Sequence, residues 1–180
     1  MPRVLAECGV RFVVVEPLPN SKIDGVCFWI NNGLVPVVGL SMRYDRIDNF
    51  WFVLRHELEH VLQNHGNSSY MVDEELEGKR ASVDEDLPED ERTANIAAAD
   101  FCVPRKSFED FVIRNHPLFS EEIVVEFADQ VKRHPGLVVG QLHRRFCRYN
   151  FLRRHLSRVR EIVVRNALTD GWGQIAPITL

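Results

Sequence analysis

Long hydrophobic runs, closely spaced cysteines and low-complexity tracts are missing from this 180-residue chain. No apolar stretch approaches the ~18 residues that cross a bilayer, and residues 1–20 lack the pattern of a secretory signal. The four cysteines are far apart, with neither a Cys-x-x-Cys pair nor the density of a disulfide framework. We therefore expect no membrane partner, and a chain that works in the reducing cytoplasm.

Two stretches of the chain each lack charges of one sign almost completely, although the net charge of the whole chain is only −4. Residues 132–165 hold ten Lys or Arg and one acid, whereas residues 73–91 hold ten acids and two basic residues. A basic stretch can bind nucleic acid, but here no aromatic interleaving or nucleic-acid motif accompanies it. We expect it to form a solvated face or to dock on the acidic stretch, and we do not expect direct nucleic-acid binding.

The first forty residues have the pattern of β-strands, and the rest that of helices. Apolar side chains recur at helical spacing from about residue 45 to 64, and Asn31-Asn32-Gly33 is a strong turn signal. Strands are predicted over 10–16, 25–30 and 35–42, and later helices over 88–102, 107–115, 120–133, 137–148 and 151–165. An acidic loop is predicted over 73–88. This order predicts an α+β fold with a small, mostly antiparallel sheet packed on the first long helix, followed by a helical C-terminal half.

One short string, His56-Glu57-Leu58-Glu59-His60, carries the strongest chemical signal. Residues four apart on a helix project from the same side, so His56 and His60 can reach one metal ion. The apolar residues of this helix lie on its opposite side, which leaves the histidine face for chemistry. A catalytic zinc ion keeps one of four positions open for water, and Glu57 would stand beside that water. The spacing therefore favours a zinc hydrolase with one ion per chain; the alternative is a solvated helix face that carries two histidines.

A third metal ligand must come from another element, and the acids between residues 73 and 91 leave several choices. Glu91 is favoured because Asn95 follows one turn later, where its amide can hydrogen-bond a ligand imidazole and fix its tautomer. Small alanines on the adjoining face would let the two helices pack closely. The rival ligands are Glu89, Asp90 and Asp100, and Glu91 could instead serve only to stabilise the helix N-terminus.

These residues resemble the ImmA/IrrE family of zinc-dependent peptidases, bacterial and phage proteins of the gluzincin type. The resemblance rests on His56–His60 with its apolar lead-in 49–54, and on Glu91-Arg-Thr-Ala-Asn95 with the alanines and Pro104 that follow. Leu40-Ser-Met-Arg-Tyr44 is a third, weaker block. Together these segments cover about residues 25–104, with fainter similarity around 135–142.

The resemblance implies that His56, His60 and Glu91 bind zinc and that Glu57 is the catalytic carboxylate. It also implies a cytoplasmic regulatory protein as substrate, often a helix-turn-helix repressor cleaved at a single site, in stress response or toxin–antitoxin regulation. Many relatives carry a DNA-binding domain, so we expect a fused or missing N-terminal partner. The family usually has glycine where this chain has Glu59, a carboxylate that either points to solvent or adds negative charge near the metal.

Several assignments stay open at this point. Candidates for stabilising the oxyanion are Tyr44, Tyr70, His65 and His116, and Arg43 is a candidate to orient a substrate carbonyl or pair with the acidic loop. We expect residues 1–134 to form the peptidase core and residues 135–180 to form a basic helical extension packed on it. The alternative function is a non-proteolytic sensor or protein-binding domain of a helix-turn-helix regulator or antitoxin, its metal site closed by a fourth protein ligand such as His65 or Cys102.

Overall fold

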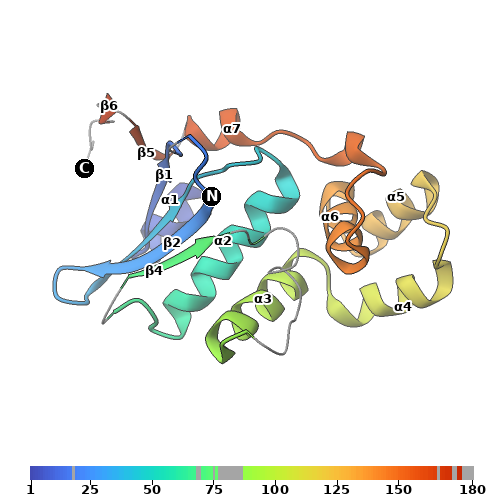
Figure 1. Cartoon of the computed structure of the whole chain (residues 1–180), viewed down its shortest axis with the longest axis horizontal. Helices are drawn as coiled ribbons and strands as arrows, with labels where there is room; N and C mark the ends of the chain where they lie inside the picture. Colours follow the sequence, from blue (N-terminus) through green and yellow to red (C-terminus); the bar gives the residue numbers. More distant parts are fainter. Residues whose placement is uncertain are drawn as a thin grey trace.

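The computed structural model describes residues 1–17, 19–67, 70–74, 76, 87–165, 167–171 and 174–175. A sheet lies on one side of the molecule and most helices on the other, which is the predicted α+β architecture (Figure 1). The strands are β1 (Arg11–Val15), β2 (Ile23–Ile30), β3 (Val35–Leu40), β4 (Met71–Glu74), β5 (Leu168–Gly171) and β6 (Gln174–Ile175). The helices are α1 (Pro2–Glu7), α2 (Ile47–Leu62), α3 (Glu89–Cys102), α4 (Arg105–Asn115), α5 (Glu121–Gln130), α6 (Pro135–Phe146) and α7 (Arg160–Val164), with a short 3-10 helix at Arg153–His155.

The sheet is mixed, with the strand order β4-β2-β3-β1-β5-β6. Strand β2 pairs antiparallel with β3 and β4, whereas β1 pairs parallel with β3 and β5. The predicted turn between β2 and β3 is present, and Asn31, Asn32 and Gly33 all take positive φ angles there. Strand β4 pairs with the other edge of β2, and β4 contributes a residue to the candidate site described below.

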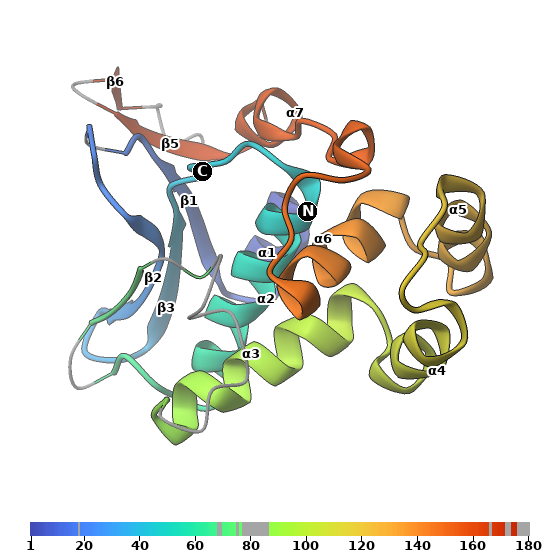
Figure 2. The same cartoon turned by 45° about the vertical axis from the view of Figure 1, so that its right-hand side comes forward.

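Helix α2 is the central element, since it contacts β2 and β3 on one side and α3 and α6 on another (Figure 2). The expectation that its apolar side is the buried one is only partly right. His56, Glu57 and His60 are fully buried, while Leu62, on the predicted apolar side, is 71% exposed. The histidine side is covered because α3 and the sheet both pack over it.

The predicted loop over residues 73–88 is wrong at its start, because Asp73 and Glu74 belong to β4 and pair with β2. Residues 75 and 77–86 of that loop lie outside the described part of the chain. A short acidic strand such as Met71–Glu74 has no apolar alternation of its own, so its strand conformation depends on the neighbouring β2.

The single helix predicted over 151–165 is also wrong. The chain makes a short 3-10 helix, an extended stretch and then α7. Leu152 takes a left-handed conformation, and the Asp45 carboxylate accepts hydrogen bonds from the backbone N–H groups of Val159 and Arg160. A carboxylate more than a hundred residues away in sequence therefore fixes where α7 begins. Helix α1, which the sequence did not predict, precedes β1.

Helix α6 packs against α2 and α5 and is buried over most of its length. Basic side chains of the 132–165 stretch pair with acids outside the 73–91 stretch: Arg160 with Glu16 and Arg154 with Glu121. The division at residue 134 stays a prediction. Among the described residues, no helix combines the length and apolar character that would let it cross a membrane.

Candidate metal and catalytic site

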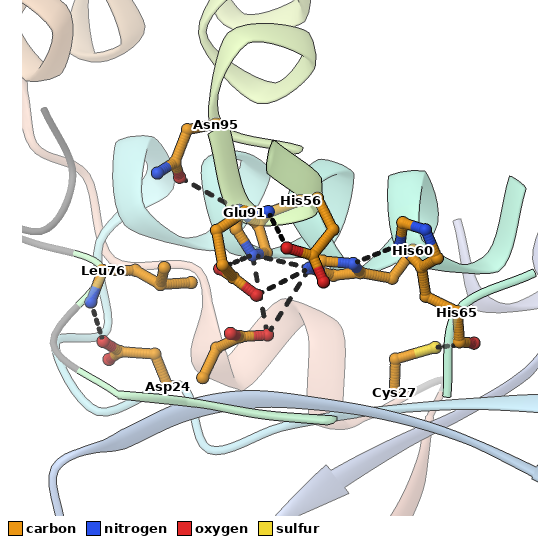
Figure 3. Close-up of polar contacts among 10 residues, drawn as sticks. Asp24, Cys27, His56, His60, His65, Leu76, Glu91 and Asn95 are labelled. Carbon is orange, nitrogen blue, oxygen red and sulfur yellow. Dashed lines mark hydrogen bonds and ion pairs between the residues drawn. The ribbon is translucent and has the colours of Figure 1, made fainter. Parts of the chain in front are cut away.

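The two histidines of α2 point to the same spot, as their i, i+4 spacing predicts. The Nε2 atoms of His56 and His60 lie 3.0 Å apart, and neither side chain reaches solvent. Nδ1 of His56 lies 3.0 Å from Oδ1 of Asn95, the contact that we predicted for Asn95 (Figure 3). Because an amide oxygen only accepts hydrogen bonds, Nδ1 of His56 donates this bond, and in the neutral imidazole Nε2 keeps a lone pair that could bind a metal ion.

Glu91 reaches the same spot from the first turn of α3. Its carboxylate oxygens lie 3.4 Å from Nε2 of His56 and 3.5 Å from Nε2 of His60. The predicted close packing of α3 on α2 is present, with Ala94 and Ala98 fully buried between them. Of the rival acids, Asp100 instead accepts a hydrogen bond from the backbone of Arg105 at the other end of α3. The structure thus brings Glu91 to the histidines, while its role as a ligand stays a prediction.

Asp73 on β4 is a fourth member of the cluster, and sequence reasoning missed it. Its Oδ2 atom lies 3.5 Å from Nε2 of His56 and 3.9 Å from Nε2 of His60, and the residue is only 6% exposed. The many acidic residues between 73 and 91 had identified this segment as a source of a metal ligand, but nothing in the sequence favoured Asp73 over the other acids. Only the pairing of Asp73 with Gly25 in the sheet places it beneath the histidines.

The four side chains together fit a divalent cation. One ligand atom from each of His56, His60, Asp73 and Glu91 lies within 4.8 Å of the other three. Atoms that bind one zinc ion at about 2.0–2.2 Å are separated by at most about 4.4 Å, so little adjustment is needed. Oδ2 of Asp73 has no hydrogen-bond partner in the described part of the chain, which is the state expected of a carboxylate oxygen built to meet a cation. Two imidazoles and two carboxylates are a donor set that zinc accepts.

Glu57 projects from α2 toward the sheet and occupies space that Gly25 leaves free. A Cβ atom on Gly25 would overlap the Glu57 carboxylate, so a larger residue at this point of β2 would displace the Glu57 side chain from its present position. Neither Glu57 oxygen finds a hydrogen-bond donor among the described residues, and the side chain is fully buried. Burial, and then the negative charge of Asp73, raise the pKa of Glu57 well above its usual value. A carboxyl group in this state can hold a proton and release it, as a general acid–base group must.

In the metal-free cluster, the charged side chains shift one another's pKa values. Burial opposes the charging of His56, but the Asp73 and Glu91 carboxylates outweigh it and raise the pKa of His56 to about 9. Burial, and then the charge on His56, lower the pKa of His60. Burial acts to raise the pKa of Asp73, but the interaction with His56 lowers it below its usual value. The cluster is therefore a place where positive charge is stabilised.

The comparison with protein families agrees with this geometry. Residues 9–127 match the family model Peptidase_M78, described as the IrrE N-terminal-like domain. The chain belongs to this family. The match includes β1 to β4, α2, α3 and every residue of the cluster, and it supports a metallopeptidase-type function. Comparison with curated proteins gave no match.

The candidates for oxyanion stabilisation lie at different places in this Peptidase_M78 domain. His65 is next to the cluster, with its Nδ1 3.2 Å from Nδ1 of His60, and its carbonyl accepts a hydrogen bond from the indole of Trp29. Tyr70 is 75% exposed just before β4. The Tyr44 ring lies under the guanidinium of Arg43, before the start of α2, and His116 stacks on Phe146. Of the four, His65 is the candidate that the fold holds in contact with a cluster histidine.

Two residues considered from the sequence have other partners. Arg43 makes two hydrogen bonds of 3.1 Å to the carboxylate of Asp24, and that carboxylate also accepts a hydrogen bond from the backbone N–H of Leu76 (Figure 3). Cys102 ends α3, eleven residues after Glu91 and so about 16 Å farther along the helix axis. Arg43 thus stabilises β2, the strand next to β4, through its bonds to Asp24. Cys102 lies in the core away from the cluster.

Glu59, which stands where the family usually has glycine, is buried and paired. It accepts hydrogen bonds from Arg55 at 2.6 Å and from Gln63 at 2.8 Å. Burial acts to raise its pKa, but these two partners lower it below the usual value. The extra negative charge of Glu59 is therefore balanced on α2 itself.

An open depression of about 430 Å³ adjoins the cluster. It is lined by Gln63, His65, Glu89, Asp90 and Thr93, from the end of α2 and the first turn of α3. Of its lining residues, His65 contacts the cluster through His60.

Proposed function

We propose that the chain is a zinc-dependent endopeptidase that acts on a regulatory protein. The observation that carries the proposal is the convergence of His56, His60 and Glu91 on one point, with Glu57 on the same helix as the histidines. Membership of the Peptidase_M78 family supports the peptidase class. In this proposal His56, His60 and Glu91 hold the zinc ion, one per chain, and Asn95 orients His56.

Glu57 carries the proton transfers of the proposed reaction. When bound, zinc would supply the Lewis acidity that lowers the pKa of water and polarises the scissile carbonyl. Glu57 accepts a proton from the attacking water and returns it to the departing amine nitrogen. Its burial next to Asp73 keeps bulk water away from the carboxyl group and raises its pKa, which favours holding the transferred proton. His65, which contacts His60, is the proposed donor to the oxyanion, and Tyr44, Tyr70 and His116 are the other candidates.

The substrate class is proposed on the family resemblance alone. A helix-turn-helix repressor cleaved at one site would make this chain a cytoplasmic switch in gene regulation, in a stress response or a toxin–antitoxin pair. A fused or separate DNA-binding partner belongs to the same proposal. The open depression beside His65 supports access for a peptide segment.

The proposal is tested with Glu57→Gln in the full chain. Glutamine keeps the size of the side chain and cannot accept the proton, so zinc content should stay at one per chain while cleavage falls by about 10²–10⁴-fold. The measurement is mass spectrometry of a proteome-derived peptide library incubated with each zinc-loaded protein. Glu126→Gln, a change of an exposed acid on α5 away from the cluster, is the matched control and should cleave as the wild type does. Equal product from wild type and Glu57→Gln would contradict the proposal.

A second candidate function is favoured by Asp73. A metal centre with four protein ligands is typical of structural zinc sites, which bind the ion without catalysis. In that case the chain would be a sensor or protein-binding domain of a helix-turn-helix regulator or antitoxin. Stable zinc binding without cleavage of any peptide, in the wild type and in variants that open the site, would favour this function.

A further inference from the structure

Asp73 is about as close to His56 as Glu91 is, although it comes from the sheet and not from α3. Its Oδ2 atom lies 3.5 Å from Nε2 of His56, and the nearest Glu91 oxygen lies 3.4 Å from the same atom. A zinc ion bound by both histidines and Glu91 would therefore have Asp73 within reach. A hydrolytic zinc site has three protein ligands and leaves its fourth position to water, so a fourth protein ligand such as Asp73 would occupy that position.

The backbone holds Asp73 in place from both directions. Asp73 pairs with Gly25 in the ladder between β2 and β4, and side chains alternate along β4, so that Val72 and Glu74 are exposed while Asp73 is buried. Three residues later, the N–H of Leu76 donates to Asp24 Oδ2 at 2.9 Å. Asp24 is in turn held by Arg43, and Leu76 is 3% exposed. The carboxylate is thus directed at the cluster by the fold.

The Oδ2 atom of Asp73 has the imidazole of His56 as an ion-pair partner at 3.5 Å, but among the described residues it makes no close hydrogen bond. Oδ2 has no hydrogen-bond partner in the described ranges, and a buried carboxylate oxygen in that state destabilises the fold. A divalent cation between Asp73 and the histidines supplies the missing interaction.

We propose that Asp73 is a fourth protein ligand, which closes the resting metal centre and acts as a latch on the peptidase. This inference rests on the proposed function. In the closed state two imidazoles and two carboxylates surround the ion. In the open state the Asp73 carboxylate leaves the ion and one water molecule takes its place, with no other bond changed. Glu57 then has the water that it is meant to deprotonate.

The position of β4 makes such an exchange feasible. The strand has four residues and lies at the end of the sheet order, and within the described part of the chain it pairs only with β2. Moving it breaks one short ladder and leaves β2, β3 and α2 paired and packed. Edge strands of this kind have a free row of backbone groups, so an extended segment of another protein can bind beside β4 and shift it.

The latch is tested on the full chain loaded with one cobalt ion in place of zinc. Acetohydroxamate is the probe, because it binds a metal only where a coordination position is available, and it changes the visible spectrum of the cobalt centre. If the open state is populated at about 0.1–10%, removing the latch tightens the apparent probe affinity by about 10–1,000-fold. Asp73→Ala should show this gain. Glu74→Ala, the next residue on β4 with an exposed side chain, is the control and should bind the probe as the wild type does.

Equal probe affinity in the wild type and Asp73→Ala overturns the latch. Should Asp73→Ala lose its folded circular-dichroism spectrum, Asp73→Asn, which keeps the shape of the side chain, is measured with the same criterion. The results distinguish a failure of the latch proposal from a failure of the peptidase proposal. Peptide cleavage by the wild type with equal probe affinities rejects the latch and keeps the peptidase, whereas tighter probe binding in Asp73→Ala without cleavage in either protein keeps the latch and rejects the peptidase.

Discussion

Three carboxylates, those of Glu57, Asp73 and Glu91, surround the imidazoles of His56 and His60. Even with His56 protonated, as its raised pKa of about 9 favours, this group carries excess negative charge in a buried place. Such an excess is costly unless a cation balances it. Zinc binding should therefore stabilise the folded chain in proportion to the logarithm of the free zinc concentration over the dissociation constant.

The residue with the tightest steric requirement is Gly25. Gly25→Ala would push the Glu57 carboxylate out of its place, and we expect a loss of about 1–3 kcal/mol in the free energy of unfolding, as for other overpacked sites. The measurement is urea denaturation of the metal-free chain, with peptide cleavage as a second readout that should fall. Glu74→Ala, an exposed change on the paired strand, should leave both unchanged. A stable, fully active Gly25→Ala variant would show that Glu57 does not need this space.

At the scale of residues, the sequence was enough to predict which side chains lie together when they are one helical turn apart. His56 and His60 are one turn apart on one helix, and Glu91 and Asn95 are one turn apart on another, so helical spacing was enough to pair them. Asp73 was missed because its neighbours are set by the register between β2 and β4, and no periodicity within Met71–Glu74 encodes that register. The contact between Gly25 and Glu57 was missed for the same reason.

Among the elements, α2 was predictable because its apolar spacing runs over more than four turns. The structure of residues 151–165 was not predictable in this way, because the start of α7 depends on hydrogen bonds to Asp45, which lies before α2. The exposed and buried sides of α2 also could not be read from its own residues. They follow from α3 and the sheet covering the histidine side, and tertiary packing of that kind overrides the amphipathic pattern.

The contact between α2 and α6 gives a test at the scale of elements. A Cβ atom on Gly140 would overlap the Asp48 side chain, so Gly140→Ala should lower the free energy of unfolding by about 1–3 kcal/mol. The higher helix propensity of alanine would offset up to about 1 kcal/mol of this loss. Thermal and urea unfolding measure the change. Ile113→Ala, on the exposed side of α4, is the control with an expected change within about 0.5 kcal/mol. A stabilised Gly140→Ala variant would mean that α6 does not pack closely on α2.

At the scale of the whole molecule, burial divides the four cysteines into two pairs. Cys8 and Cys147 are exposed, while burial raises the pKa of Cys27 to about 12 and that of Cys102 to about 11. A raised pKa means less thiolate at pH 8, and thiolate is the reactive form. A disulfide reagent at pH 8 should therefore label two thiols rapidly in the folded chain and all four after denaturation. Rapid labelling of Cys27 or Cys102, identified by mass spectrometry, would contradict the described core.

The cluster depends on the whole fold, since its members come from α2, β4 and α3. The measurement that tests it most directly is anomalous X-ray diffraction at the zinc edge from crystals of the zinc-loaded chain. The account predicts one strong peak per chain, at about 2.0–2.2 Å from Nε2 of His56, Nε2 of His60 and a carboxylate oxygen of Glu91. A peak that lies elsewhere, or no peak at a zinc concentration that saturates the protein in solution, would contradict it.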